Sequence, residues 1–258
     1  MRISIVGAGR VAHHLLNVLH PQHHIVQVYA RNLDNAEKLA ATVGAEAIHT
    51  PTKLNAEIDL LIIAVSDQSI ATVIQQVTAY LPQVLIVHTS GSTNITVLTQ
   101  QHLRAGVFYP LQTFSLDRDV DWTSTPIFVE AADSTDLRTL TDLANSMSQR
   151  VYQYDSAQRL SLHLAAVFAC NFSNYCYDMA KQVVDAKYVD FSLLYPLILE
   201  TAKKATQAEP RNMQTGPAMR GDQNIMQMHA NMLEQADQVD LKAVYEMLSQ
   251  QIFELHQK

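Results

Sequence analysis

Short apolar runs alternate with amphipathic segments through the first half of the chain. Six runs have the pattern of strands, and most are apolar at successive positions, as expected of a parallel sheet covered by helices on both faces. These runs span residues 3–6, 25–29, 60–65, 84–88, 106–109 and 127–130. Helical patterns separate them, at 10–19, 33–43, 68–80 and 95–101. The alternation predicts an α/β fold with a Rossmann-type, doubly wound parallel sheet.

The pattern changes near residue 150, after which strand-like runs are no longer found. Long helical patterns replace them, at 156–186, 192–207, 223–235 and 241–256. The main interruption is a loop rich in proline and glycine at 209–222. We therefore predict a Rossmann-type α/β domain at 1–152 and an all-helical domain at 153–258.

The first strand is followed at once by the sequence GAGRVA. Gly7, Gly9 and Ala12 occupy the three small-residue positions of the dinucleotide fingerprint G-x-G-x-x-G/A. The first permits a tight turn, the second lets the backbone approach a pyrophosphate, and the third lets the helix pack closely on the strand. An ordinary strand-to-helix turn is the alternative. The strand before the motif and the helix after it favour a dinucleotide site, with predicted contacts at Gly7, Ala8, Gly9, Arg10 and Val11.

The second strand ends near Tyr29, at the position where an NAD site normally offers an acidic residue to the ribose hydroxyls. Arg31 and Asn32 follow here instead. A guanidinium can pair with a 2′-phosphate through two hydrogen bonds, whereas a carboxylate would repel that group. We therefore predict NADP as the cofactor, with a solvated loop arginine as the alternative. The missing acidic residue also argues against an S-adenosylmethionine site.

Polar residues follow the ends of further predicted strands. In open α/β sheets, ligands bind at the edge formed by the carboxyl ends of the strands. The predicted cofactor contacts at this edge are Val65, Ser66, His88, Thr89 and Ser90. Tyr109, Pro110 and Gln112 follow the 106–109 strand, so we expect cofactor and substrate to meet here.

The long helical pattern at 156–186 carries a polar stripe. At about 100° per residue, His163, Asn171, Asn174 and Asp178 fall within roughly 80° of one another. One interpretation is a solvated helix face, although such faces usually carry Lys and Glu. The other is the wall of an active-site cleft, in which His163 donates a proton while a carbonyl or imine accepts hydride. Asn171 or Asn174 would then orient the substrate.

The loop at 215–222 is the second candidate for substrate binding, with Arg220 placed to hold a substrate carboxylate. The alternative is a plain connection in which Asp222 caps the next helix. The predicted catalytic residues are therefore His163, Asn171, Asn174 and Arg220. No metal site is predicted, because the clustered histidines near residue 20 lack accompanying cysteine or acidic residues.

Composition narrows the classes of function. Hydrophobic residues make up 48% of the chain and charged residues 17%, which excludes a disordered chain. The formal net charge of -7 disfavours a nucleic-acid partner. Cys170 and Cys176 fit neither a metal-ligand spacing nor a disulfide framework, so we expect buried thiols in a reducing cytoplasm. Neither a signal segment nor an apolar stretch of about 18 residues is present, and we expect no membrane insertion.

Five blocks of sequence together resemble a family of Rossmann-like oxidoreductases with a C-terminal domain of unknown function. They are GAGRVA at 7–12, HTSGS at 88–92, GVFYPLQTFS at 106–115, HLAAVFACNF at 163–172 and TGPAMRGD at 215–222. The N-terminal half also resembles pyrroline-5-carboxylate reductase and the deazaflavin-dependent NADP reductases. The two-domain plan is similar to that of the 6-phosphogluconate and 3-hydroxyisobutyrate dehydrogenases. The resemblance implies an NADP-binding domain, a helical domain that often forms a homodimer, and an active-site cleft between them.

The chain departs from the hydroxyacid dehydrogenases at one point. They use a Lys followed four residues later by Asn, whereas Val167 stands four residues before Asn171 here. A Lys-based proton relay is therefore not expected. Our hypothesis is an NADP-dependent oxidoreductase that acts on a small carbonyl, imine or alcohol. A non-catalytic NADP sensor or scaffold is the alternative, and a nucleotide-sugar or S-adenosylmethionine enzyme is a third possibility that Arg31 argues against.

Overall fold

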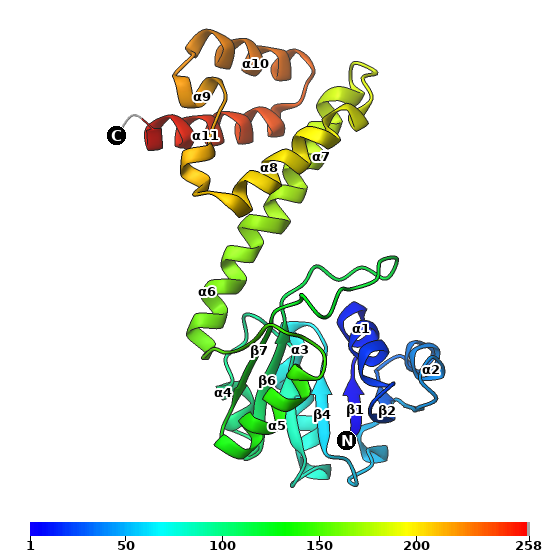
Figure 1. Cartoon of the computed structure of the whole chain (residues 1–258). Coiled ribbons are helices and arrows are strands. Elements are labelled where there is room, and N and C mark those ends of the chain that lie inside the picture. The colour runs from blue at the N-terminus through cyan, green and yellow to red at the C-terminus, as the bar shows by residue number, and fades with distance from the viewer. Residues whose placement is uncertain (257–258) are drawn as a thin grey trace. The chain divides into compact units, whose positions relative to one another are not determined.

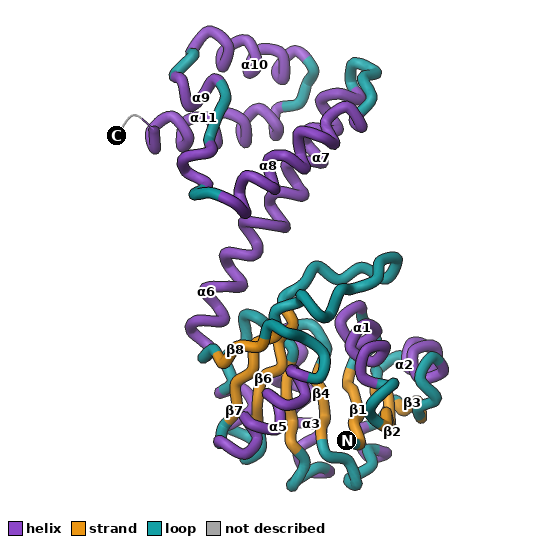
Figure 2. Tube along the Cα trace, in the orientation of Figure 1, coloured by secondary structure: helices purple, strands orange, loops and turns teal. Residues whose placement is uncertain are grey.

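The computed structural model describes residues 1–256 and contains two compact units. The first unit comprises Met1–Cys170 and holds the sheet, whereas the second begins at Asn171 and is helical. Figure 2 shows all strands of the described chain within the first unit. The predicted limits of the two functional domains, 1–152 and 153–258, stay a prediction, because they concern binding roles and not compactness.

In the described part of the chain, the sheet has eight strands in the order β3-β2-β1-β4-β5-β6-β7-β8. Their bounds are β1 Arg2–Val6, β2 His24–Tyr29, β3 Glu46–Ile48, β4 Leu60–Ile63, β5 Leu85–His88, β6 Ala105–Pro110, β7 Ile127–Ala131 and β8 Val151–Gln153. All neighbours are parallel except β6 and β7, which are antiparallel. The first six strands follow the Rossmann order, so the predicted fold class is confirmed. The order reverses between β1 and β4, where such sheets bind ligands (Figure 1).

Helices cover both faces of this sheet. Their bounds are α1 Arg10–Leu19, α2 Leu33–Ala41, α3 Asp67–Val77, α4 Thr96–Thr99 and α5 Ser134–Asn145. Leu60 and Ile62 of β4 pack in the cluster that includes α1, α2 and α5, whereas Leu61 and Ile63 pack in the cluster that includes α3 and α4. Alternate residues of one strand are therefore buried on opposite faces, which explains its continuous apolar run.

The structure differs from the sequence prediction in a few elements. Strands β3 and β8 and helix α5 were not predicted, and strand structure therefore continues slightly past residue 150. Both strands have three residues and lie at the sheet edges, so they are too short to show a period of two. The helix expected at 95–101 is only four residues long, and the one at 68–80 ends as a 3-10 turn.

The helical region confirms the prediction of an all-helical C-terminal part. Its helices are α7 Ser173–Asp185, α8 Tyr195–Gln207, α9 Pro217–Arg220, α10 Gln223–Gln235 and α11 Val239–His256. Two short 3-10 segments, η4 Phe191–Leu194 and η5 Pro210–Met213, lie between these helices. Two others, η1 Pro51–Lys53 and η2 Thr78–Tyr80, belong to the first unit. Across residues 1–256, no helix combines the length and hydropathy that a membrane span requires.

The long helix expected at 156–186 is interrupted. It consists of α6 Ser156–Ala166, a π-helical segment η3 Val167–Phe172, and α7. Because π turns bond residue i to i+5, the spacing of 100° per residue does not hold through η3. The expectation of buried thiols is wrong, since Cys170 and Cys176 are both exposed. The apolar sequence of this stretch does not translate into burial, because α7 buries no side chain.

Candidate active site

The turn between β1 and α1 has the backbone that the fingerprint predicts. Gly7 has a φ of +117°, and a Cβ at this position would collide with the carbonyl oxygen of Ala64. Glycine alone tolerates both conditions. Gly9 precedes α1 as its N-cap, and no atom lies within 4 Å of the place where its Cβ would stand. The N-terminus of α1 therefore opens onto space in which an anion can be bound by backbone N–H groups.

A cavity of about 970 Å³ lies at this turn. Ten of the twelve predicted cofactor contacts line it: Gly7, Ala8, Gly9, Arg10, Val11, Arg31, Asn32, Val65, Ser66 and Thr89. They lie at or just after the ends of β1, β2, β4 and β5, four strands that are adjacent in the sheet. The other two predicted contacts, His88 and Ser90, do not line the cavity. Residues far apart in the sequence thus converge on one site.

The lining of this cavity is positively charged. Arg10 and Arg31 contribute two guanidinium groups, and no carboxylate is found among the described residues that line it. Arg31 is exposed and forms no hydrogen bond or ion pair with another described residue. Asn32 beside it caps α2, accepting a hydrogen bond from the backbone N–H of Asn35 at 3.2 Å. Two cations without an acid suit a ligand that carries several phosphates.

His88 and Ser90 stabilise the turn that follows β5. His88 Nδ1 accepts a hydrogen bond from the backbone N–H of Ser90 at 3.2 Å. Ser90 Oγ accepts from the N–H groups of Ser92 at 3.1 Å and Thr93 at 2.9 Å. Burial lowers the pKa of His88 to about 3, and the Arg159 guanidinium lowers it too. The ring is therefore neutral, and since Nδ1 accepts, its proton resides on Nε2, which has no partner among the described residues.

His163 lies against this turn. It is carried by α6, whose start is held by a capping box between Asp155 and Gln158. His163 Nδ1 lies 3.1 Å from Tyr109 Oη, within hydrogen-bond distance. A Cβ on Gly91 would stand 2.6 Å from His163 Nδ1 and 2.6 Å from Tyr109 Cζ. Only glycine at position 91 lets the histidine and the tyrosine meet beside the turn.

Tyr109 stays neutral in this environment. Burial raises the pKa of Tyr109 to about 12, an effect that Arg159 partly opposes and Asp67 reinforces. A neutral phenol can either donate to or accept from an imidazole nitrogen. Its contact with His163 is therefore compatible with both protonation states of the histidine. The pair can hold a proton beside the cofactor edge of the sheet.

Three predicted catalytic residues belong to the helical unit. Asn171 and Asn174 are exposed, on the π-helical segment and on α7 respectively. Arg220 is exposed at the end of α9. Asp222 does cap α10, accepting a hydrogen bond from the N–H of Ile225 at 3.3 Å, as the alternative interpretation of this loop expects. Roles for Asn171, Asn174 and Arg220 in substrate binding stay predictions.

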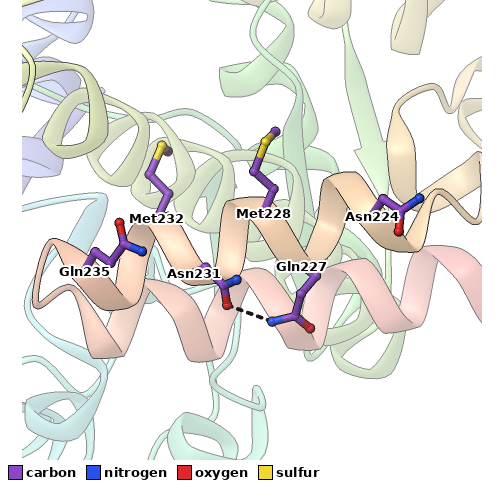
Figure 3. Close-up of a pocket in the computed structure, with 6 residues that line it drawn as sticks. All are labelled: Asn224, Gln227, Met228, Asn231, Met232 and Gln235. Atoms are coloured by element: carbon purple, nitrogen blue, oxygen red, sulfur yellow. Dashed lines mark hydrogen bonds between the residues drawn. The ribbon is translucent and has the colours of Figure 1, made fainter.

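A second hollow, of about 510 Å³, is lined by residues of α10 alone. Figure 3 shows Met228 and Met232 projecting from the same side of the helix, and a hydrogen bond of 2.8 Å from the Gln227 amide to Asn231 Oδ1. Its lining contains only amide and thioether side chains, which do not titrate. Among residues 1–256, no group of three His, Cys, Asp or Glu side chains is placed to hold a metal ion.

Two features of the site lie outside the predicted residues. Tyr109 stands at the end of β6, where sequence reasoning located polar residues without singling one out. Arg159 is fully buried and forms an ion pair with Glu130 at the end of β7. An arginine near a helix start usually faces solvent, so the sequence carries no signal for this burial. For Glu130, the only sequence signal of a functional role is its position as a polar residue near the end of an apolar strand.

The fold and the cationic cavity at the glycine turn define a dinucleotide-binding α/β protein. Comparison with known families agrees. Residues 2–91 match the model described as NADP oxidoreductase coenzyme F420-dependent. Residues 125–252 match the model of a domain of unknown function, DUF2520. No functionally curated protein is found to match the chain.

Solved structures extend the comparison. A Bacteroides fragilis protein, described provisionally as an NADP oxidoreductase, is 40% identical, with 98% of each chain covered and a TM-score of 0.92. A Thermotoga maritima protein is 21% identical, with 99% of this chain and 100% of that one covered and a TM-score of 0.80. An imine reductase from Myxococcus stipitatus in complex with NADP+ is 14% identical, with coverage of 95% and 92% and a TM-score of 0.71.

This chain belongs to the family of NADP oxidoreductases that carry a DUF2520 domain, as its identity to the Bacteroides fragilis protein over nearly the whole length shows. The resemblance inferred from the five sequence blocks is thereby confirmed, together with the enzyme class and NADP as the cofactor. The imine reductase shares the fold.

Proposed function

We propose that this chain moves hydride between NADPH, bound in the cavity of about 970 Å³, and the carbon of a small imine, carbonyl or alcohol. One observation carries the proposal: the glycine turn, Arg31 and the polar residues after β4 and β5 line a single cavity. Such convergence at the switch point of a Rossmann sheet is what a dinucleotide requires. NADPH, when bound, supplies the hydride.

The residues of this cavity fit each part of the cofactor. Backbone N–H groups at Gly7 to Val11 would hold the pyrophosphate, because the space beside Gly9 is open and α1 begins there. The unpaired guanidinium of Arg31 would bind the 2′-phosphate. Ser66 and Thr89, which line the same cavity, would contact the nicotinamide part, and His88 and Ser90 stabilise the turn that presents Thr89.

His163 supplies the proton that accompanies hydride transfer. A carbonyl or imine that accepts hydride becomes an alkoxide or amide anion, which must be protonated, and an imidazole is a common proton donor in such steps. Tyr109 keeps the ring in place through its contact with Nδ1, leaving Nε2 for the substrate. Asn171 or Asn174 would orient the substrate, and Arg220 would hold a carboxylate on it.

Substitution of His163 tests this assignment. His163→Ala should lower turnover about 100- to 10,000-fold while the dissociation constant of NADPH stays within about twofold. NADPH oxidation with a panel of small aldehydes, ketones and cyclic imines gives the first quantity, and calorimetric titration gives the second. Equal losses in turnover and affinity, or unchanged turnover, would contradict the role of His163.

A matched control exists in the helical unit. There His229 Nδ1 lies 3.0 Å from Tyr245 Oη, a second His–Tyr contact of the same kind. His229→Ala should leave both turnover and NADPH affinity unchanged.

The alternative hypothesis predicts a different outcome. If NADPH binding changes the assembly of the protein, and no compound of the panel supports NADPH oxidation, the protein is a sensor or scaffold.

The proposed assembly is a homodimer formed through the helical unit. Its exposed apolar side chains include Tyr195, Leu197 and Leu199 on α8, and α8 buries none of its side chains. Residues 197 and 199 lie on opposite sides of a helix, so one neighbouring helix cannot cover both. Large exposed apolar surfaces mark interaction sites, and a second copy of the chain is the commonest partner. The uncharged face of α10 in Figure 3 adds surface without like-charge repulsion.

We place the protein in the cytoplasm. Both of its cysteines are free and exposed, a state that a reducing compartment maintains. Its partners in this proposal are NADP, a small-molecule substrate and a second copy of the chain, without nucleic acid or membrane.

A further inference from the structure

We propose that Arg159 and Glu130 form a positioning device for the active site, which sets the turn after β5 and the turn of α6 that carries His163. The inference rests on the proposed function for its meaning and on the first unit alone for its geometry. Neither residue belongs to the predicted set of cofactor or catalytic contacts.

Arg159 is fully buried and every side of its guanidinium is bound. Its Nε donates to the backbone carbonyl of Ser90 at 3.2 Å, and its Nη2 donates to the carbonyl of Thr93 and to Ser156 Oγ, the latter at 3.2 Å. Its Nη1 pairs with Glu130 Oε2. One side chain thus joins the turn after β5, the end of β7 and the start of α6.

Glu130 completes the network from the sheet. Its side chain is 17% exposed and also accepts a hydrogen bond from Ser156 Oγ, at 2.8 Å to Oε2. Ser156 Oγ in turn accepts from the backbone N–H of Ile95 at 3.0 Å. Burying a charged pair costs desolvation energy, which is recovered only when geometry and hydrogen bonds are complete. Apolar residues of similar size often stabilise a core as well as a buried ion pair does. We therefore look for a role of Arg159 and Glu130 beyond stability.

The positions of the network's members supply that explanation. Arg159 stands four residues before His163, which places both on the same face of α6 one turn apart. Ser90, whose carbonyl Arg159 holds, directly precedes Gly91, the residue against which His163 and Tyr109 meet. The Arg159 guanidinium therefore holds both the turn at Ser90 and the helix α6 that carries His163. Thr89, on the other side of Ser90, lines the cofactor cavity.

A second ion pair of the first unit provides the control. Arg104 Nη2 lies 2.5 Å from Asp136 Oδ1, and Arg104 Nη1 donates to the carbonyl of Gln83 at 2.7 Å. This pair also joins an arginine, a carboxylate and a backbone carbonyl. It lies just before β6 and at the start of α5, and it makes no contact with His163 or with the turn after β5. The Arg104 side chain is 41% exposed and that of Arg159 1%, so Arg104→Lys controls for the loss of an arginine–carboxylate pair, whereas effects on His163 should follow Arg159→Lys alone.

The experiment compares Arg159→Lys with Arg104→Lys in the full-length protein. Lysine keeps the charge but cannot span three carbonyl and carboxylate partners as guanidinium does. The first readout is the tautomer and titration of the His163 ring by ¹⁵N nuclear magnetic resonance, assigned by its loss in His163→Asn. The others are the dissociation constant of NADPH and turnover with the substrate panel.

We expect Arg159→Lys to shift the His163 titration, to weaken NADPH binding and to lower turnover about 100-fold, as displacement of a catalytic group by about 1 Å does. Arg104→Lys should change none of the three. If Arg159→Lys does not fold, Ser156→Ala removes only the hydroxyl between the charges and should shift the same three quantities by a smaller factor. An unchanged His163 titration in a folded Arg159→Lys or Ser156→Ala variant would overturn the inference.

The outcomes also separate this inference from the proposed function. Failure of the wild-type protein to bind NADPH would reject the proposed function, while the His163 resonances would still report whether Arg159 positions that ring. Normal NADPH binding and turnover in Arg159→Lys would reject the positioning role and leave the proposed function intact.

Discussion

The two units of this chain bury their apolar residues to very different extents. In the first, every residue of β4 and β5 is buried, and α1 and α3 each present a buried stripe to the sheet. In the described part of the second, the buried hydrophobic residues are Ala218, Ala230 and Leu233. Both units have regular helices, so the contrast lies in packing and not in secondary structure.

The contrast shows what each unit can do on its own. A domain is stable when it buries enough apolar surface to offset the loss of chain entropy, and small domains reach that point with difficulty. The first unit contains an extensive buried core, and its cavity and the His163–Tyr109 contact lie within that unit. The second has too little buried surface, and we expect a partner copy to provide the remainder.

The largest expected effect is on assembly. Leu199 is 70% exposed on α8 of the second unit, and Leu103 is 87% exposed in the first. A glutamate buried at an interface between two copies would be desolvated without a partner, at a cost of several kcal/mol. Leu199→Glu should therefore weaken dimerisation about 100-fold or more by analytical ultracentrifugation, and Leu103→Glu should not change it. If the wild-type protein were monomeric, or if both variants changed the dimerisation constant equally, the second unit would not be the dimer interface.

The next effect concerns cofactor choice in the first unit. Charge-assisted hydrogen bonds contribute about 1.5–3 kcal/mol, so Arg31→Gln should weaken NADPH binding roughly 10- to 150-fold. NADH lacks the 2′-phosphate and should bind wild type and variant alike. Calorimetric titration with both cofactors measures the difference. If Arg31→Gln weakened the two cofactors equally, Arg31 would not be the residue that selects NADP.

A smaller effect separates binding from folding at the glycine turn. No atom lies within 4 Å of a Cβ on Gly9, so Gly9→Ala should leave the thermal stability of the cofactor-free protein unchanged. In the proposed function, the added methyl group would crowd the pyrophosphate, at a cost of about 1–3 kcal/mol, or roughly 5- to 150-fold in NADPH affinity. Unchanged affinity would place the pyrophosphate elsewhere.

Per pH unit, the smallest effect is a dependence of the unfolding free energy on pH that arises in the first unit. Burial holds the pKa of His88 at about 3, below its ordinary value of 6.5, so the unfolded chain binds more protons between these limits. Stability therefore rises with pH through this window and falls as pH is lowered from 6.5. His88→Asn should reduce the slope of the unfolding free energy by about 1.4 kcal/mol per pH unit. Denaturant titrations across the window measure it, and an unchanged slope in His88→Asn would contradict the assignment to His88.

The parts of the account that the sequence predicted are local. Helix α1 begins and ends where its pattern indicates, at Arg10 and Leu19, and ten of twelve predicted cofactor contacts line one cavity. Both agreements with the structure follow from rules that act over short distances: apolar runs for buried strands, and small residues wherever the backbone must turn or leave open space; contact with the cofactor stays a prediction.

The parts that the sequence did not predict depend on residues that meet only in the folded chain. Tyr109 and His163 are 54 positions apart, and Glu130 and Arg159 are 29 apart. Nothing in the local pattern around Arg159 distinguishes a buried arginine from a solvated one. The π-helical segment likewise shifts the polar stripe that a regular helix would align, so the predicted grouping of His163 with Asn171 has no geometric support from helix periodicity.

The central claim is that the cavity at the glycine turn binds NADPH in preference to NADH. Thermal unfolding of the wild-type protein, measured with NADPH, with NADH and with neither, tests it most directly. At about 100 times its dissociation constant, NADPH should raise the unfolding midpoint by roughly 5 to 11 °C, with little change for the same concentration of NADH. No shift with NADPH, or an equal shift with both cofactors, would contradict the claim.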